Sequence, residues 1–307
     1  MAKLKVSFEW LSGCSGCEVG TVDLHDKLLQ IFEDLEILRL PILMDEKGYP
    51  KADIGIVTGA LRTEHDVECL HAMRKSCDKL LAFGICAVYG GPQGANDAHT
   101  LAEIEDTVYR KNPTTSTHFV PDKDLPKLLA AGVRPIDSEV DVDYFLPGCP
   151  PNPYYIAQAL KAVVAGAAPD FGAHNVCYRC NRTMSHSDVA AIKRSHEVVD
   201  DGRCWLSQGV LCMGSATLDR CLAPCPKRAV PCTGCAGPSE YVMLEPYRDV
   251  RTEIADRMSR LTAIPREAVV EEIERRAKTY YAYAMSSPIF REKPTFLFKR
   301  WMARGEQ

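Results

Sequence analysis

Cysteine is the residue type with the most chemical potential in this chain, and its densest group lies between residues 177 and 235. The group contains eight thiols, namely Cys177, Cys180, Cys204, Cys212, Cys221, Cys225, Cys232 and Cys235. Its first and last pairs have Cys-x-x-Cys spacing, which lets two thiolates reach one metal centre from a single turn of backbone. Eight thiols divide into two sets of four, the number of ligands that a cubane iron–sulfur cluster needs.

The middle of this group favours iron–sulfur clusters over zinc binding or disulfide pairing, which are the two alternatives. Cys221-x3-Cys225-Pro226 has the spacing found at the end of the cluster-binding run of bacterial ferredoxins. The chain has fourteen cysteines in all, and its quickly polar start at residues 1–6 predicts no secretion signal and hence a cytoplasmic location. In a reducing cytoplasm, cysteines are better metal ligands than disulfide partners.

Composition narrows the classes of function. The chain has 307 residues, of which 46% are hydrophobic, so one large domain or two ordinary domains can form hydrophobic cores. The net charge of −4 argues against nucleic-acid binding through bulk positive charge. There is no run of apolar residues as long as the roughly 18 that a membrane span needs, so none is expected.

The elements that must position these cysteines alternate in type along the first half of the sequence. Apolar runs predict strands over residues 5–10, 36–43, 52–61, 79–87 and 143–146. Apolar residues recur at helical spacing over 24–35, 66–77 and 154–165, and residues 92–139 form a longer irregular excursion. Strands that alternate with helices predict an α/β fold with a flavodoxin-like, doubly wound parallel sheet.

Four further cysteines follow the expected strands. Cys14 and Cys17 come after the first strand, Cys86 lies at the fourth, and Cys149 follows the fifth. Ligands of open α/β sheets bind beyond the carboxyl ends of the strands, so these thiols are expected to converge on a third cluster. A flavin phosphate in the same crevice, or thiols that act as small buried hydrophobes, are the alternatives.

Two more cysteines are predicted to be core residues. Cys69 and Cys77 share an expected helix face with Met73, as buried thiols often do.

The whole chain is predicted to divide into three parts. The predicted domains are a flavodoxin-like domain over 1–168, an irregular ferredoxin-like iron–sulfur domain over 169–240, and a helical extension over 241–307. In the extension, Lys, Arg and aromatic residues from 291 to 307 are either a solvated tail or a docking segment.

Three motifs together resemble the small, electron-transfer subunit of nickel–iron hydrogenases. They are Cys14-x-x-Cys17-Glu18, Gly84-x-Cys86 with Gly90-Gly91, and Gly148-Cys149-Pro150-Pro151. The resemblance extends over about residues 5–240 and includes the cysteine-rich segment. The chain is similar in particular to the cytoplasmic, viologen-reducing and F420-non-reducing type that is associated with heterodisulfide reductase.

This resemblance implies three 4Fe–4S clusters. It implies a proximal cluster on Cys14, Cys17, Cys86 and Cys149. It implies a medial cluster on Cys221, Cys225, Cys232 and Cys235, and a distal cluster on Cys177, Cys180, Cys204 and Cys212. In that family a histidine usually stands where this chain has Cys177. His174-x2-Cys177 also matches the family's His-x2-Cys pair, so His174 is an alternative distal ligand in place of Cys177 or Cys180.

The resemblance also implies a role and partners. The chain would relay electrons from hydrogen oxidation at a separate nickel–iron large subunit to a partner such as a 2Fe–2S protein and heterodisulfide reductase. It would be a non-catalytic subunit of the enzyme. The alternatives are an electron-transfer subunit of a respiratory-complex-type oxidoreductase, whose related domain has adjacent cysteines in place of the Cys14-x-x-Cys17 spacing, and a zinc-stabilised scaffold.

Glu18 has two interpretations. A carboxylate beside an anionic cluster is repelled, which raises its pKa and makes it a candidate for proton transfer. A carboxylate in the first turn of a helix is also favoured by the helix dipole alone.

Overall fold

The computed structural model describes residues 3–116, 118–280 and 282–287. These residues form two compact units. The first unit extends to Pro169 and also includes Met285–Ser287, whereas the second unit comprises Asp170–Ala284. The segment 291–307, expected to be either a solvated tail or a docking segment, lies outside the described residues.

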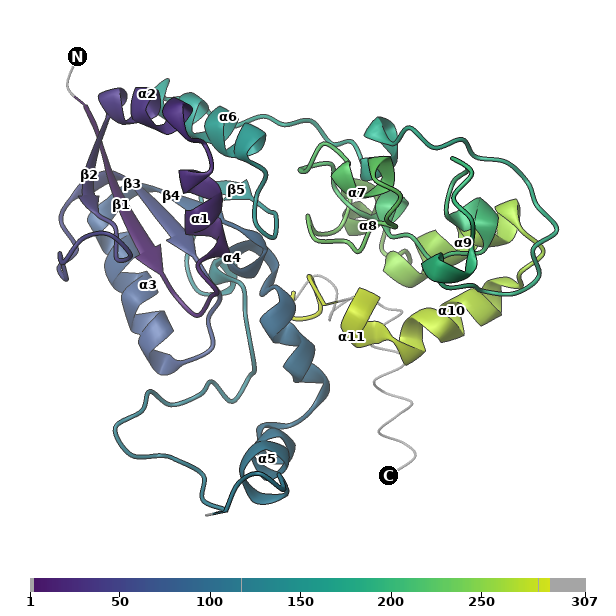
Figure 1. Ribbon diagram of the computed structural model, residues 1–307. Coiled ribbons are helices and arrows are strands. Elements are labelled where there is room, and N and C mark those ends of the chain that lie inside the picture. Colours follow the sequence, from purple (N-terminus) through teal and green to yellow (C-terminus); the bar gives the residue numbers. More distant parts are fainter. Residues whose placement is uncertain (1–2, 117, 281, 288–307) are drawn as a thin grey trace. The chain divides into compact units, whose positions relative to one another are not determined.

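A five-stranded parallel sheet forms the frame of the first unit (Figure 1). Its strands are β1 (Leu4–Trp10), β2 (Leu35–Arg39), β3 (Ala52–Thr58), β4 (Cys77–Phe83) and β5 (Tyr144–Leu146). They lie in the order β2-β1-β3-β4-β5, and each neighbouring pair is parallel. The direction of winding reverses beside β1, which is the topology of a doubly wound sheet. The predicted α/β class is therefore confirmed.

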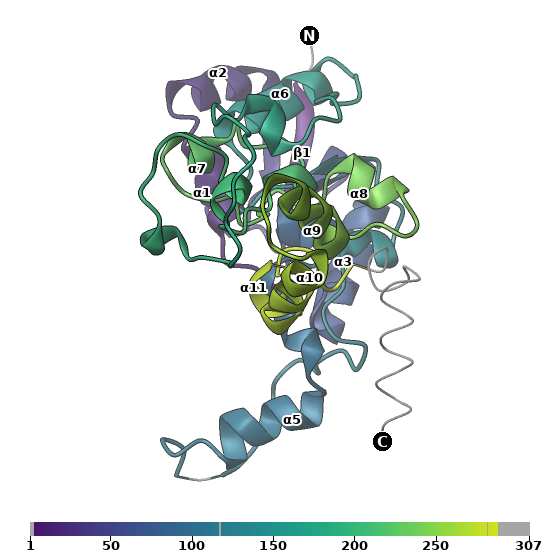
Figure 2. The ribbon, with the colours of Figure 1, turned by 90° about the vertical axis from the view of Figure 1, so that its right-hand side faces the viewer.

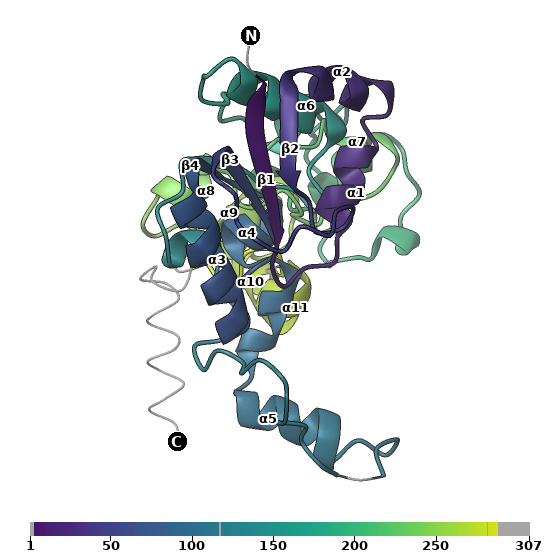
Figure 3. The same ribbon diagram turned by 90° about the vertical axis from the view of Figure 1, so that its left-hand side faces the viewer.

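Helices connect these strands and cover both faces of the sheet. They are α1 (Gly16–Val22), α2 (Asp26–Asp34), α3 (Glu64–Ser76), α4 (Ile85–Tyr89), α5 (Leu101–Glu105) and α6 (Pro153–Val164), with 3-10 turns at Pro92–Ala98 and Ile136–Ser138 and a π turn at Asp106–Arg110. Helix α2 packs beside α6, and α3 packs against β3 and β4. Figure 3 shows α3 on one side of the sheet and α1, α2 and α6 on the other. Right-handed crossovers that run in both directions from β1 produce this arrangement.

The core of the first unit explains why the sheet can serve as a rigid frame. Consecutive residues of β3, Ile56 and Val57, are both buried, as expected for a strand that has helices on both faces. Leu70 and Met73 of α3 are fully buried and belong to one hydrophobic cluster with Val57 and Leu80. Burial of each large apolar side chain stabilises the fold by about 1.5–3 kcal/mol.

Three predicted strands end earlier in the structure, and one of them is β3, which ends at Thr58 instead of residue 61. Strand β2 ends at Arg39 instead of continuing to residue 43, because Pro41 cannot donate a hydrogen bond to a neighbouring strand. Strand β4 ends at Phe83 instead of residue 87, because Gly84 has a φ of 91° and turns the chain into α4. Cys86 therefore lies on a short helix beyond the strand.

Two predicted helical segments also differ. The helix predicted over 24–35 begins only at Asp26, because His25 has a φ of 51° and separates α2 from the preceding helix α1. Helix α3 begins at Glu64 behind a capping box, in which the Asp66 amide donates to Thr63 Oγ1 at 3.1 Å. It ends at Ser76, so Cys77 is the first residue of β4 and does not share the helix face; its side chain is nevertheless buried.

The second unit contains helices and loops, and no strand is found among its described residues. Its helices are α7 (Pro224–Lys227), α8 (Glu240–Leu244), α9 (Val250–Leu261), α10 (Arg266–Arg275) and α11 (Ala277–Tyr280), with 3-10 turns at Val176–Arg179, Ser195–Glu197, Leu206–Gln208 and Gly214–Ala216. Helices α9 and α10 pack against each other (Figure 2). Throughout the described part of the chain, no helix has the length and apolar content needed to span a membrane.

Candidate metal centres

Four of the predicted ligands meet at the carboxyl edge of the sheet. Cys14, Cys17, Cys86 and Cys149 all line one pocket with a volume of about 60 Å³. The first two lie in the turn from β1 into α1, the third on α4 after β4, and the fourth in the loop after β5. Parallel strands end at the same edge, so three loops that are distant in sequence deliver their thiols to one place.

Two glycines allow the backbone to approach these thiols closely. Gly84 has a φ of 91°, and a Cβ atom there would overlap with the sulfur of Cys17. Gly91 has a φ of 63°, and a Cβ atom there would lie 2.6 Å from the sulfur of Cys86. Any other residue would suffer both backbone strain and a steric clash at either position. This glycine cradle fits a site in which the thiols face a bulky group instead of packing as apolar core.

The electrostatics of the pocket favour metal ligation over four free thiolates. Burial raises the pKa of Cys17, and Glu18 and the three neighbouring thiols raise it further. Burial also raises the pKa of Cys86 to about 11, although a hydrogen bond with Gln93 opposes this shift. Four thiolates at one place repel each other unless a bound cation compensates their charge, and a metal-coordinated thiol is deprotonated outright. The donor set therefore fits an iron–sulfur cluster.

Two polar side chains border the pocket: Glu18, which the sequence predicts as a candidate, and Gln93, which it does not. Glu18 is buried, and Thr58 Oγ1 donates a hydrogen bond to its Oε1 atom. Its Oε2 atom has no hydrogen-bond partner among the described residues. Gln93 was not predicted; its Nε2 atom donates to the carbonyl of Ser12 while its side chain contacts Cys86. Its position directly after Gly90-Gly91-Pro92 is the sequence signal that could have identified it.

The thiols predicted to be distal ligands form a second group. Cys177 lies in a 3-10 turn, Cys204 and Cys212 precede two other 3-10 turns, and Cys180 follows the first. Cys177 is exposed as a residue, but its sulfur lies among protein atoms, and burial raises its pKa to about 12. Negative charge on each of the other three thiols would raise this pKa further. The structure thus brings all four within electrostatic reach.

The remaining cysteines are arranged as two pairs. Electrostatic interactions couple Cys221 to Cys225 and Cys232 to Cys235, and both Cys221 and Cys232 have pKa values raised by burial. Cys232 also contacts the previous group, because its amide donates to the sulfur of Cys212 at 3.2 Å. These contacts define the pairs, and the assignment of all four thiols to one set stays a prediction.

Backbone amides point at several of these sulfurs. The amides of Gly214, Ala223 and Gly234 hydrogen-bond to thiols that lie two residues earlier, which are Cys212, Cys221 and Cys232. Leu222 and Ala223 have φ values of 64° and 53°. Left-handed residues in such turns direct successive amides toward one point and create an anion-binding concavity, as in many iron–sulfur sites. The loops therefore fit anionic, thiolate-bound clusters.

His174, the alternative distal ligand, has a different contact. Its ring stacks on Tyr178 with centroids 3.9 Å apart and planes 7° from parallel. Cys180 instead interacts electrostatically with Cys177 and Cys212. This placement supports Cys177 and Cys180 as the distal pair, while their ligand role stays a prediction.

Comparisons with known proteins agree with these features. A family model described as NADH ubiquinone oxidoreductase, 20 Kd subunit, matches residues 14–163. The chain is 38% identical over 239 residues to a vhu subunit of the F420-non-reducing hydrogenase of Methanocaldococcus jannaschii, an alignment that covers 77% of this chain and 83% of that protein. It is 31% identical over 330 residues to an iron–sulfur subunit of the F420-non-reducing hydrogenase of Archaeoglobus profundus, an alignment that covers 96% of this chain and 99% of that protein.

One solved structure is similar to the first part of the chain in both fold and sequence. A chain of an NAD+-reducing NiFe hydrogenase in the H2-reduced state has a TM-score of 0.53 and 33% sequence identity. The match covers 56% of this chain and 96% of that chain. The resemblance to hydrogenase small subunits is thus confirmed, and the relatives described above are of the F420-non-reducing type. The chain belongs to the family of electron-transfer subunits of F420-non-reducing hydrogenases, and its role is electron transfer within an oxidoreductase complex.

Proposed function

We propose that the chain carries electrons from hydrogen oxidation at a nickel–iron large subunit to an acceptor protein through three 4Fe–4S clusters. The observation that carries this proposal is the convergence of Cys14, Cys17, Cys86 and Cys149 on one pocket at the carboxyl edge of the sheet. The order is proximal, medial and distal. The ligand sets are Cys14, Cys17, Cys86 and Cys149 for the first; Cys221, Cys225, Cys232 and Cys235 for the second; and Cys177, Cys180, Cys204 and Cys212 for the third.

The residues of the chain have three tasks in this proposal. A bound 4Fe–4S cluster supplies one-electron redox chemistry. The thiols fix its position, Gly84 and Gly91 keep side chains out of the space that it needs, and the amides of loops such as that of Gly214 stabilise thiolate charge. Ligation by four thiolates, without neutral imidazole, favours a low reduction potential, since histidine ligands raise the potential of Rieske centres.

The proposed partners follow from the family and from the chemistry of the edge of the sheet. The large subunit is the proposed neighbour of the proximal site, because electrons can leave the nickel–iron centre only through a nearby acceptor. Downstream, we propose a 2Fe–2S protein and heterodisulfide reductase as the acceptors. The cytoplasm is the proposed location, where reduced thiols remain available for cluster assembly.

Glu18 is the proposed proton carrier at the proximal site. It is a buried carboxylate that lines the same pocket as the four thiols, and its Oε2 atom has no partner among the described residues. An oxygen with this freedom can accept a proton from a neighbouring group. Its contact with Thr58 holds the other oxygen in place.

Metal analysis of the anaerobically purified complex tests the proposal. The expected content is about thirteen irons for each pair of this chain and the large subunit, since each of three cubane clusters holds four and the nickel–iron centre adds one, together with nickel in the co-purifying subunit. An iron content near five, or stoichiometric zinc in place of cluster iron, would contradict the three-cluster relay. Iron without a nickel-containing partner would instead favour an electron-transfer subunit of the respiratory-complex type.

A further inference from the structure

Arginine side chains lie beside two of the proposed distal ligands. A cavity of about 370 Å³ in the second unit is lined by Cys177 and Cys204 on one part of its wall and by residues of α9 on another. Arg257, on α9, lines this cavity and interacts electrostatically with both thiols. A fixed positive charge therefore faces the place where the distal cluster is proposed.

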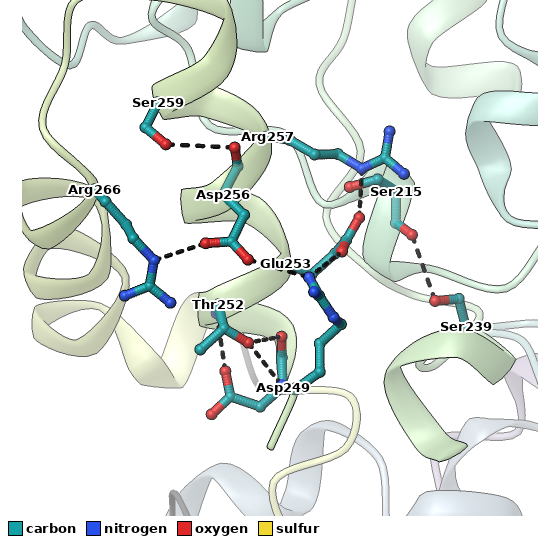
Figure 4. A network of polar contacts seen from close by, with 10 residues as sticks. Ser215, Ser239, Asp249, Thr252, Glu253, Asp256, Arg257, Ser259 and Arg266 are labelled. Carbon is teal, nitrogen blue, oxygen red and sulfur yellow. Dashed lines mark hydrogen bonds and ion pairs between the residues drawn. The ribbon is translucent and has the colours of Figure 1, made fainter. Parts of the chain in front are cut away.

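A buried carboxylate holds this arginine. The Glu253 side chain is only 3% exposed, and its Oε1 atom accepts from Arg257 Nε, one helical turn further along α9 (Figure 4). Its Oε2 atom accepts from Arg248 Nη1 at 2.9 Å. With a guanidinium on each oxygen, Glu253 is compensated from two sides, and it fixes the direction in which Arg257 extends.

The charge of Arg257 is secure at any accessible pH. A guanidinium is not deprotonated in proteins, and the Glu253 carboxylate that accepts its hydrogen bond favours the charged form further. The guanidinium side chain is 37% exposed, so solvent screens part of its field. A group that never loses its charge acts as a constant term in the local electrostatic potential.

We propose that Arg257 is a charge-compensating residue that raises the reduction potential of the distal cluster, and that Glu253 is the residue that positions it. This inference rests on the proposed function, in which Cys177, Cys180, Cys204 and Cys212 hold that cluster. Each electron that arrives there adds one negative charge, which the nearby guanidinium stabilises by Coulomb attraction. The potential of the distal site would thus be higher than it would be without Arg257, which favours electron transfer to that site.

The primary test is a redox titration followed by electron paramagnetic resonance on the assembled complex. Arg257→Gln should lower one of the three cluster potentials and leave the other two unchanged. The expected change is about tenfold in the one-electron equilibrium constant, which corresponds to about 59 mV. Arg257→Lys keeps the charge, so the potential of the distal cluster in this variant should lie closer to the wild-type value than it does in Arg257→Gln.

A matched control removes the same charge from the neighbouring helix α10. Arg266 donates to Asp256 Oδ1 at 2.6 Å, reaches α9 from a different side in Figure 4, and does not line the cavity. Arg266→Gln should therefore leave all three potentials unchanged. An equal shift in this control would overturn the proposal, because the effect would then come from net charge alone.

A second variant tests the positioning role of Glu253. Glu253→Gln removes a negative charge, which raises the potential, and loosens Arg257, which lowers it. In the Arg257→Gln background only the first effect remains, so Glu253→Gln should raise the potential more there than in the wild type. Equal shifts in the two backgrounds would overturn the positioning role. If Arg257→Gln fails to retain iron, Arg257→Met removes the charge in its place, and an unchanged potential in that variant overturns the proposal.

The failure of the inference differs from the failure of the proposed function. Unchanged potentials in Arg257→Gln, with full iron content and three cluster signals, would overturn the role of Arg257 alone. A wild-type complex with no cluster signal that depends on Cys204 would overturn the distal site itself, and the inference with it.

Discussion

The two units deliver their thiols in different ways. In the first unit, the ligands of the proposed proximal site stand at the ends of regular parallel strands, and the hydrophobic core beneath them is independent of any metal. In the second unit, the eight cysteines lie in loops with short helical turns, and no strand occurs among its described residues. The proximal site of the first unit is thus positioned by the fold itself, whereas the cysteine-bearing loops of the second unit need further contacts to hold them in place.

Arginine side chains provide some of these contacts within the second unit. Arg182 Nη1 and Nη2 each donate to Asp200 at 2.7 Å, and its Nε atom donates to the carbonyl of Pro226 at 3.0 Å. Its guanidinium also lies 4.1 Å from the ring centroid of Trp205. One side chain thus joins three loop segments. Such contacts orient loops, but they bury little apolar area, so bound clusters should carry much of the stability here.

The largest expected effect is therefore that of iron removal. Chelation of iron from the reduced complex should expose the amides of residues 177–235 to hydrogen exchange, because loops that are tied by metals unfold without them. The amides of β3 and β4 should remain protected by the core around Leu70 and Leu80. Hydrogen exchange with mass spectrometry measures both regions in one sample. Equal loss of protection in both would contradict the distinction between the units.

The next largest effect concerns single thiols within the first unit. Cys149→Ala should lower hydrogen-driven viologen reduction by more than about 100-fold, since even residues that only support metal ligands cost 10–100-fold. Cys69→Ala is the matched control: Cys69 is half-buried on α3, and its sulfur lies 3.5 Å from His65 Nε2, away from the four-thiol pocket. It should cost only about 1 kcal/mol of stability. Equal activities of the two variants would show that Cys149 is not a ligand.

Two separate glycine substitutions test the same comparison with a smaller structural change. Gly84→Ala should lower the iron content by about four per chain, because the new methyl group overlaps with the sulfur of Cys17 in the cradle. Gly166 has a φ of 67° but no atom within 4 Å of the added Cβ, so Gly166→Ala should cost only about 1–2 kcal/mol of backbone strain. Iron analysis and thermal unfolding of both variants provide the test. Full iron content in Gly84→Ala would mean that the cradle is not needed.

The same contrast explains how much could be predicted from the sequence. Strand β1 and helix α6 were predicted to within one residue at each end, and β3 was predicted with its correct start, because apolar runs and helical periodicity report directly on burial. The convergence of Cys14, Cys86 and Cys149 followed from the general geometry of parallel sheets. The changed limits of β2 and β4 trace to local chemistry at Pro41 and Gly84, because a run of apolar residues reports on burial and not on the backbone conformation that ends a strand.

Other features could not be predicted because they depend on packing between distant segments. Glu253 and Arg257 are four residues apart on a predicted helix, a spacing that is typical of an exposed ion pair. Only the structure shows that Glu253 is buried and that Arg257 faces Cys177 and Cys204. Gln93 is similar: its contact with Cys86 depends on the path of the loop between them.

The smallest expected effect tests the metal-independent stability of the first unit through Asp143. Its carboxylate accepts from Lys79 Nζ at 2.8 Å, Arg74 Nη1 at 3.0 Å and the Leu80 amide at 2.9 Å, and it thereby ties the start of β5 to β4. Partial burial opposes the charge, but these donors outweigh it and lower the pKa of Asp143. Asp143→Asn should therefore destabilise β4 by about 1 kcal/mol near neutral pH. Asp78→Asn, which removes the exposed ion pair with Lys51, should cost at most a few tenths of a kcal/mol.

The pH dependence of this effect has a definite sign. Because the folded-state pKa of Asp143 lies below the unfolded value of about 3.9, its contribution is fully present above that pH and is lost as the pH falls toward the folded pKa. The difference between the wild type and Asp143→Asn should stay constant from about pH 7 to pH 5 and shrink below about pH 4. The urea dependence of hydrogen exchange in β4 measures it in the intact complex. A difference that already disappears between pH 7 and pH 5 would assign the effect to another titrating group, and the stability of the sheet would then not rest on this carboxylate.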